Sequence, residues 1–155
     1  GHGLSMAVGM AYATKVAREN GLVYCVLSDG EVQEGSTWEA TMMASSFGVN
    51  NLVAFIDNND FQSLGRTSET HPSFYPVREK FEAFGWECAE VDGHDSQAIF
   101  DAVNSRVGDK PFMAVCKTTK GKGVSYMENV PIWHYRSPSP EEFQIAMDEL
   151  SGAVS

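Results

Sequence analysis

Two short polar segments each follow an apolar run of strand length. The Ser-Asp-Gly segment 28–30 comes directly after the run 22–27, and the Asp-Asn-Asn-Asp segment 57–60 comes directly after the run 52–56. If the two runs are neighbouring parallel strands, both segments lie at the same edge of the sheet. Carboxylate and amide oxygens are hard donors that suit Mg²⁺, which usually shares its other positions with water and substrate phosphates. The pattern therefore indicates a magnesium site that can also hold a phosphate.

The residues around the first polar segment favour anion binding as well. Gly30 would let the backbone approach a phosphate closely, and a helix expected to begin near Glu34 would direct its N-terminus at the anion. Asp-Gly and Asn-Asn-Asp are also ordinary turn-forming sequences. Taken one at a time, each segment is better interpreted as a turn; only their joint spacing favours a site.

The elements that position these segments alternate along the chain. Apolar residues at helical spacing over 4–20 predict a first helix that ends at Gly21, and Asp95 is expected to cap a later helix. The last helix has a capping box, with Ser139 before Pro140 and Glu142 three residues after the serine. The other predicted elements are strands 22–27, 52–56, 86–91 and 111–117 and helices 34–47, 74–84 and 96–106. This order predicts an α/β fold with a doubly wound, mostly parallel sheet and helices on both faces.

Composition excludes several classes of partner. The chain has 155 residues, 43% of them hydrophobic, and a formal net charge of -10. One domain with a buried core is expected from this length and composition. No basic stripe is present to neutralise nucleic-acid phosphates or an anionic membrane. No apolar run reaches a membrane span of about 20 residues, and the cysteines are expected to be buried thiols in a reducing compartment. We therefore expect a cytoplasmic protein.

The spacing of the two polar segments resembles a known cofactor signature. Ser28-Asp29-Gly30, followed after 27 residues by Asn58-Asn59, is similar to the Gly-Asp-Gly and Asn-Asn signature of thiamine-diphosphate enzymes. Beyond it, the resemblance to the transketolase family covers nearly the whole chain in order, and is strongest to the N-terminal half of transketolases that are split into two chains. The segments that carry this wider resemblance are 28–40, 81–86, 91–95, 117–123 and Trp133-His134.

The resemblance implies a role for several residues of the predicted site. Asp29 and Asn59 would ligate Mg²⁺ through their side chains, and Phe61 through its backbone carbonyl. Gly30, Glu31 and Asn59 would lie against the diphosphate of the cofactor. The implied cofactors are thus thiamine diphosphate and Mg²⁺.

Two further residues match catalytic positions of the family. His134 corresponds to a histidine that reaches both the diphosphate and the bound sugar, and Glu34 to a glutamate in a carboxylate network at the subunit interface. For His94, a turn followed by a helix cap at Asp95 is favoured over a catalytic role. Ser28 replaces the first glycine of the signature, and the basic loop 120–123 departs from the usual transketolase sequence.

The implied function is transfer of a two-carbon ketol unit from a ketose, as a phosphate, to an aldose. Residues 1–155 would form the diphosphate-binding domain, lacking its N-terminal portion. The pyrimidine-binding domain would come from a partner, in a homodimer or a heterotetramer. Two alternatives remain open at this point. One is the alpha subunit of a 2-oxo acid dehydrogenase, which shares the signature but not the loop 117–123 or Trp133-His134. The other is a non-catalytic, flavodoxin-like module that binds a metal and phosphate.

Overall fold

A computed structural model describes residues 1–63 and 65–152 of the chain. Within these residues, strands β1, β2, β6 and β5 form one sheet in that order, and every adjacent pair is parallel. The strand bounds are β1 Val23–Ser28, β2 Leu52–Asn58, β5 Glu87–Asp92 and β6 Phe112–Lys117. β1 and β2 are therefore neighbours, as the site prediction requires.

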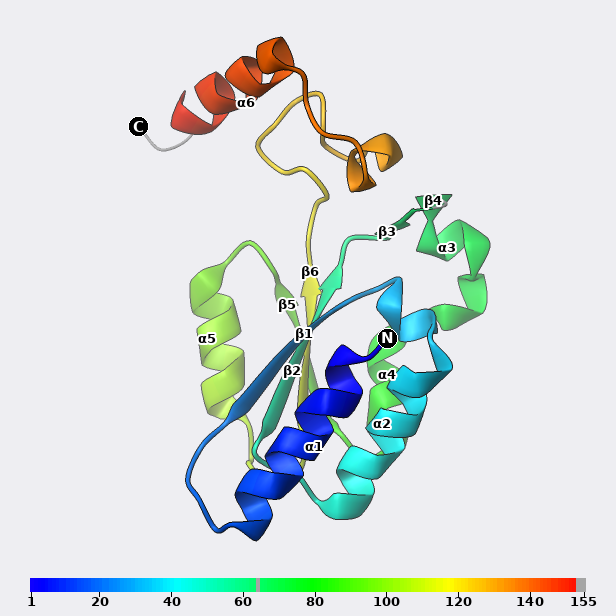
Figure 1. Cartoon of the computed structure of the whole chain (residues 1–155), viewed down its shortest axis with the longest axis vertical. Helices are drawn as coiled ribbons and strands as arrows, with labels where there is room; N and C mark the ends of the chain where they lie inside the picture. The colour runs from blue at the N-terminus through cyan, green and yellow to red at the C-terminus, as the bar shows by residue number, and fades with distance from the viewer. Residues whose placement is uncertain (64, 153–155) are drawn as a thin grey trace.

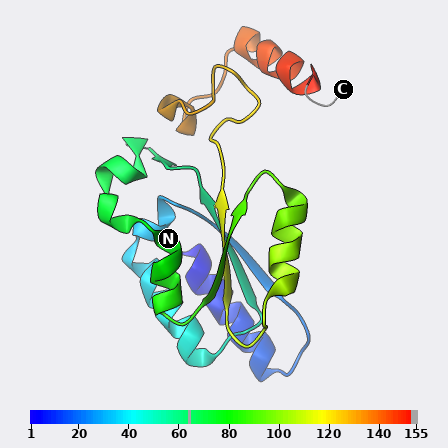
Figure 2. The same ribbon diagram turned by 180° about the vertical axis from the view of Figure 1, so that it is seen from behind.

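Helices cover both faces of this sheet. Helices α1, α2 and α4 lie on one face, and α5 lies on the other, as Figures 1 and 2 show. Their bounds are α1 Gly3–Val16, α2 Gly35–Phe47, α4 Val77–Ala83 and α5 Ser96–Ser105. The predicted doubly wound α/β fold is confirmed.

Alternation along the strands divides the core into two clusters. On β2, Ala54 and Ile56 face the cluster that includes α1, α2 and α4, whereas Val53 faces the cluster beside α5. All three side chains are buried. A parallel strand covered on both faces is apolar at nearly every position, which is why this strand reads as a continuous apolar run.

The observed caps of α2 and α5 agree with the predicted helix bounds, whereas the observed end of α1 does not. Gly48 caps α2 in the left-handed conformation with φ 59°, and the Asp95 carboxylate caps α5 by accepting hydrogen bonds from two backbone N–H groups. The predicted end of the first helix at Gly21 is wrong. The helix ends at Val16, and Arg18 takes the positive φ of 57° instead. Glycine adopts a positive φ more readily than other residues, which is why Gly21 was expected to end the helix, but Arg18 adopts the left-handed conformation instead.

Two parts of the chain lie beyond the carboxyl edge of the sheet, and the first of them was not predicted. A small antiparallel pair, β3 (Phe61–Gln62) and β4 (Gly65–Arg66), follows β2. It leads into helix α3 (Thr67–Thr70) and the 3₁₀ turn η2 (Pro72–Phe74). After β6, the chain extends beyond the sheet to a 3₁₀ turn, η3 (Pro131–His134), and helix α6 (Pro140–Gly152), as Figure 1 shows.

The cap of α6 has the predicted form. The Ser139 hydroxyl accepts from the Glu142 N–H at 3.2 Å, and the Glu142 carboxylate accepts from the Ser139 N–H at 2.8 Å. This reciprocal pair is the capping box that the sequence indicates.

The state of the cysteines and the length of the helices can be compared with the expectations of buried thiols and of no membrane span. All three cysteines are free; Cys25 and Cys116 are buried, and Cys88 is half-buried. Burial raises the pKa of Cys88 to about 12, and nearby Glu82 adds to the effect, so this thiol stays protonated. Among residues 1–63 and 65–152, no helix is both long and apolar enough to cross a membrane.

Phe81 supplies a test of the larger core cluster. Its ring is 0% exposed and lies 5.1 Å from the Trp38 ring and 5.6 Å from the Trp86 ring, between ring centroids. Phe81→Ala should lower the free energy of unfolding by about 3–5 kcal/mol, because it leaves a cavity. Phe100→Ala is the matched control: Phe100 is 63% exposed, and the change should cost about 0.5 kcal/mol or less. Urea denaturation of both variants measures the difference, and similar losses would contradict this description of the core.

Candidate functional site

The two predicted loops meet at the carboxyl edge of the sheet. Strand pairing places Ser28 opposite Asp57, and the Asp29 N–H donates to the Asp57 carbonyl at 3.2 Å. The backbone N–H of Asp60 also interacts with the Asp29 carboxylate. The parallel register therefore brings the two segments together although 26 residues, 31–56, separate them in the sequence.

Asp29 is a buried carboxylate whose two oxygens differ. The residue is 1% exposed, and its Oδ1 accepts the Gly30 N–H at 2.8 Å. Its Oδ2 has no hydrogen-bond partner within the part of the chain that the structure describes. The pKa of Asp29 is raised to about 6, chiefly by burial and to a smaller extent by the charges of Asp57 and Asp60, against the hydrogen bonds from the two backbone N–H groups. A cation at Oδ2 would satisfy this oxygen and offset the cost of burying the charge.

Asn59 is held in one orientation beside Asp29. Its Nδ2 donates to the Asp57 carboxylate at 3.0 Å, and its Oδ1 accepts the Phe61 N–H at 2.9 Å. The other oxygen of the Asp57 carboxylate accepts the Thr118 hydroxyl, which follows β6. Sequence reasoning proposed Asn59 but missed the roles of Asp57 and Thr118, because their partnership joins residues far apart in the chain.

The donor set around these loops has the chemistry of a hard cation site. It includes the Asp29 carboxylate and the Asn59 amide oxygen. In the described residues, no group of three or more His, Cys, Asp or Glu side chains could hold a metal. A mixed oxygen set with few carboxylates fits Mg²⁺, which keeps several positions for water and phosphate.

Asp60 organises the loop that continues from this site. It adopts a positive φ of 66°, and its carboxylate accepts from Arg66 at 3.1 Å and from the Ser68 N–H at 2.8 Å. It also accepts from the Thr67 hydroxyl at 2.9 Å. Burial alone would raise the pKa of Asp60, but the hydrogen bonds from Ser68, Thr67 and Arg66 lower it. Asp60 therefore stays ionised and fixes the β3–β4 pair against the site.

A cavity of about 420 Å³ opens beside the two loops and gathers most of the predicted site residues. Its lining includes Gly30, Glu31, Glu34, Phe61 and His134, with Gly1, Ser28, Gln62 and Ser63. Asp29 and Asn59 are not part of the lining, but their carboxylate and amide oxygens accept hydrogen bonds from the N–H groups of the lining residues Gly30 and Phe61. The structure therefore brings all the predicted residues to one place.

Gly30 has a spatial role at this cavity. Its φ of -65° is one that any residue adopts, so its backbone conformation does not require glycine. A Cβ at this position would lie 3.3 Å from the Gln62 Cβ. The absence of a side chain thus keeps the β3 segment close to the loop after β1 and leaves the backbone open to a ligand.

His134 reaches the cavity from η3, which is anchored by the preceding residue. The Trp133 indole N–H donates to the Tyr126 carbonyl at 2.9 Å, and the Arg136 guanidinium lies 4.5 Å above the Trp133 ring. Arg136 pairs in turn with Glu142 of α6 at 2.7 Å. His134 itself is exposed at the cavity, on a turn fixed by its neighbours.

His94 has a structural contact. Its Nε2 accepts the Thr119 N–H at 2.8 Å, which ties the loop after β5 to the loop after β6. Its own N–H donates to the Asp92 carboxylate at 2.9 Å. These bonds agree with the interpretation of residues 92–95 as a turn leading to a helix cap.

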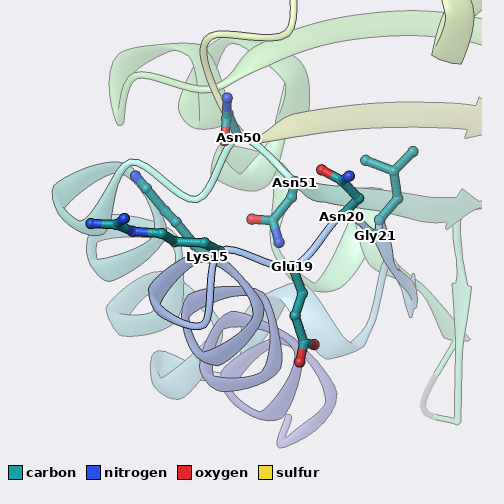
Figure 3. Close-up of a pocket in the computed structure, with 8 residues that line it drawn as sticks. Lys15, Glu19, Asn20, Gly21, Asn50 and Asn51 are labelled. Atoms are coloured by element: carbon teal, nitrogen blue, oxygen red, sulfur yellow. The ribbon is translucent and has the colours of Figure 1, made fainter.

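A second cavity, of about 390 Å³, lies at the opposite edge of the sheet, near the amino ends of β1 and β2. Figure 3 shows Lys15, Glu19, Asn50 and Asn51 around it. The Lys15 ammonium group donates to the carbonyls of Phe47 and Gly48, at 2.9 and 2.6 Å, and so stabilises the end of α2. Ligands of open parallel sheets bind at the carboxyl ends of the strands, so this cavity is not the expected site.

The fold and the site agree with one family of cofactor-binding domains. Residues 1–142 match the family model of transketolase, thiamine diphosphate binding domain. The chain therefore belongs to the transketolase family and contains its thiamine diphosphate binding domain.

Individual relatives support this assignment. The chain is 40% identical over 156 residues to one subunit of the apulose-4-phosphate transketolase of Phocaeicola vulgatus, and the match covers 99% of this chain and 55% of the relative. It is 38% identical to the SqwG subunit of the 6-deoxy-6-sulfo-D-fructose transketolase of a Clostridium species, over 97% of this chain and 55% of the relative. The crystal structure of transketolase from Campylobacter jejuni superposes with a TM-score of 0.89 at 28% identity, over 97% of this chain and 25% of that one. The chain thus spans about half the length of the two curated relatives.

The environment of Asp29 generates a pH prediction for the metal-free chain. Its pKa of about 6 lies above the ordinary value of 3.8, so the folded chain binds the extra proton between these values. The stability that Asp29 contributes is then present below about pH 4 and lost as the pH rises through about 6. Asp29→Asn should remove this dependence and gain up to about 3 kcal/mol relative to the original chain over that range.

Chemical denaturation in EDTA at several pH values measures this difference. Asp109→Asn is the control, because Asp109 is exposed and should give the pH profile of the original chain. Parallel profiles for Asp29→Asn and the original chain would refute the assignment of a raised pKa to Asp29.

Proposed function

We propose that this chain forms one half of a transketolase-type active site. The activity is transfer of a two-carbon ketol unit from a ketose phosphate to an aldose, in carbohydrate metabolism, with thiamine diphosphate and Mg²⁺ as cofactors. The observation that carries the proposal is the buried Asp29 carboxylate, whose Oδ2 has no partner among the described residues, at the edge where β1 and β2 end. Membership of the transketolase family indicates that thiamine diphosphate is the cofactor for this site.

In this proposal the magnesium ion is held by three groups of this chain. Asp29 contributes Oδ2, Asn59 contributes Oδ1, and Phe61 contributes its backbone carbonyl. Support comes from the unpartnered Asp29 oxygen and from the position of the Asn59 oxygen next to the Phe61 backbone. The remaining positions belong to water and to the diphosphate, as is usual for Mg²⁺.

The diphosphate is proposed to lie in the 420 Å³ cavity, against Gly30 and Glu31 and beside Asn59. Support comes from the open backbone at Gly30 and from the 13-residue helix α2, which begins close by at Gly35. The N-terminus of such a helix favours an anion. Since the chain carries a net charge of -10, local dipoles and the metal must outweigh an acidic surface.

When bound, thiamine diphosphate supplies the nucleophilic carbon that carries the ketol unit. The contribution of this chain is orientation and proton handling. His134, at the cavity mouth, is proposed to hydrogen-bond the diphosphate and a hydroxyl of the sugar and to hold a proton there. Trp133 keeps the η3 turn in place for this task.

The other half of the site is proposed to come from a partner with the pyrimidine-binding fold. The two curated relatives are each named as one subunit of a transketolase, and the match covers 55% of the length of each. Residues 1–155 would belong to the diphosphate-binding domain, in a homodimer or heterotetramer. Glu34 is exposed at the cavity rim, where a carboxylate network across the interface could include it. The three free cysteines support a cytoplasmic location.

The donor is proposed to be an anionic ketose. The names of two relatives specify apulose 4-phosphate and 6-deoxy-6-sulfo-D-fructose, each with a charged group on the sugar. Neither relative is named for an oxo acid, which favours ketol transfer over the 2-oxo acid dehydrogenase alternative. A non-catalytic module would show no turnover, so His134 could not affect it.

The partner requirement is the first test of this function. The chain alone, with thiamine diphosphate and Mg²⁺, should show no ketol transfer from ketose phosphates, because the cofactor's aminopyrimidine ring is held elsewhere. Adding a pyrimidine-domain partner should produce turnover, and pyruvate should not replace the ketose. A coupled assay with and without the partner measures this. Full turnover by the chain alone would contradict the proposed division of the site.

The second test concerns His134. His134→Ala in the assembled enzyme should lower kcat about tenfold or more, since general acid–base groups contribute at least that much. The melting temperature should change little, because the side chain is exposed. His71→Ala is the control: His71 is exposed on a loop outside the cavity and should leave both quantities unchanged. A fall in melting temperature with normal kcat in the folded fraction would assign His134 to structure.

A further inference from the structure

The amide of Asn59 is fixed from both of its ends. Its Nδ2 donates to Asp57 Oδ2 at 3.0 Å, and its Oδ1 accepts the Phe61 N–H at 2.9 Å. Asp57 and Asn59 lie on the same side of the loop, two residues apart, as β2 ends at Asn58. An asparagine side chain has one acceptor end and one donor end, so its orientation decides which end is offered to a ligand.

The partners of Asn59 permit one orientation only. An ionised carboxylate accepts hydrogen bonds and cannot donate, whereas a backbone N–H donates and cannot accept. A half-turn of the amide would set the Asn59 oxygen against the Asp57 carboxylate and the Asn59 NH₂ against the Phe61 N–H. Both hydrogen bonds would then become repulsive contacts. The Asn59 oxygen is therefore held on the side of Phe61, away from Asp57.

Asp57 is in turn held by a third strand. Its Oδ1 accepts the hydroxyl of Thr118, the first residue after β6. The Thr118 N–H also donates to the Asn58 carbonyl at 3.3 Å, so hydroxyl and backbone tie together the ends of β2 and β6. These strands are paired in parallel, with Asp57 opposite Cys116. The orientation of Asn59 thus depends on a chain of contacts that runs from β6 through Asp57.

We propose that Asp57, held by Thr118, is a positioning residue that keeps the Asn59 carbonyl oxygen directed at the metal. The proposal rests on the proposed function, in which Asn59 ligates Mg²⁺. Asp57 does not touch the metal or the cofactor; it acts through the amide that it orients. Groups that orient the ligands of a metal typically change its affinity by about 10–100-fold when they are replaced.

Asp57→Asn tests the role of the carboxylate. An amide at position 57 can offer either end to Asn59, so only the Phe61 N–H would still fix the orientation of the Asn59 amide. The Mg²⁺ concentration for half-maximal thiamine diphosphate binding should rise about 10–100-fold. Calorimetric titration of thiamine diphosphate into the full chain with its partner, at a series of Mg²⁺ concentrations, measures this value. Asp92→Asn is the matched control, since Asp92 ends β5 and accepts the His94 N–H instead; it should leave the value unchanged.

Exchanging the two side chains tests orientation by rescue. In the double variant Asp57→Asn/Asn59→Asp, the amide NH₂ at position 57 can donate to the carboxylate at position 59. The amide carbonyl at position 57 can still accept from Thr118. An oxygen of the carboxylate at position 59 then faces the metal. The double variant should recover Mg²⁺ affinity to within about threefold of the original, at least about three times better than Asp57→Asn.

Substitutions at Thr118 test the same contact without changing any charge. Thr118→Val removes the hydroxyl that fixes Asp57 and should weaken Mg²⁺ binding at least about threefold, whereas Thr118→Ser keeps the hydroxyl and should retain affinity. This pair also serves if Asp57→Asn does not fold. Unchanged Mg²⁺ affinity in folded Asp57→Asn, or equal affinities for the two Thr118 variants, would overturn the role of Asp57. An original chain that binds thiamine diphosphate without any Mg²⁺ dependence would instead refute the proposed function.

Discussion

The parallel pairing of β1 with β2 is the constraint on which the site depends. This pairing sets Ser28 opposite Asp57 and lets the Asp29 N–H donate to the Asp57 carbonyl. A shift by one residue would turn the buried side chains of both strands to the wrong face, so the hydrophobic core fixes the register. The same register leaves the Asp29 carboxylate at the end of the sheet, buried and with one oxygen unpartnered among the described residues. Core packing thereby positions the polar chemistry.

Much of this framework could be predicted from the sequence because its signals are local. The strands are covered on both faces and read as apolar runs, and Gly48 and Asp95 end or begin helices through their own backbone or side-chain preferences. Asp29 and Asn59 were recognisable because two turn-forming segments follow two such runs at a spacing that resembles a cofactor signature. The fold brings all the predicted site residues into or directly behind one cavity. Their roles at the cofactor remain predictions.

The remaining features depend on contacts between distant residues. The Thr118 hydroxyl bonds to Asp57, 61 residues earlier, and no local pattern marks either residue as a partner of the other. The role of Asp60 likewise appears only when the loop folds back to place Arg66 and Ser68 around its carboxylate. At the end of α1, Arg18 takes the left-handed turn that a glycine three residues later was better suited to adopt. Tertiary contacts decide each of these cases.

In the proposed site, polar groups fixed by hydrogen bonds lie next to a cavity whose rim is exposed. Asn59 and Asp57 are locked by hydrogen bonds from neighbouring strands, whereas Glu34 and His134 are exposed on turns. A fixed Asn59 oxygen would suit Mg²⁺ in the proposed site, because this ion demands a near-octahedral arrangement of oxygens. In the proposed function, the exposed turns would leave room for a substrate to enter and for a partner to cover it. A buried carboxylate in the metal-free chain costs stability, and the cation and the second half of the site would offset that cost together. The stability of the domain and the assembly of the enzyme would then be coupled through the single oxygen of Asp29.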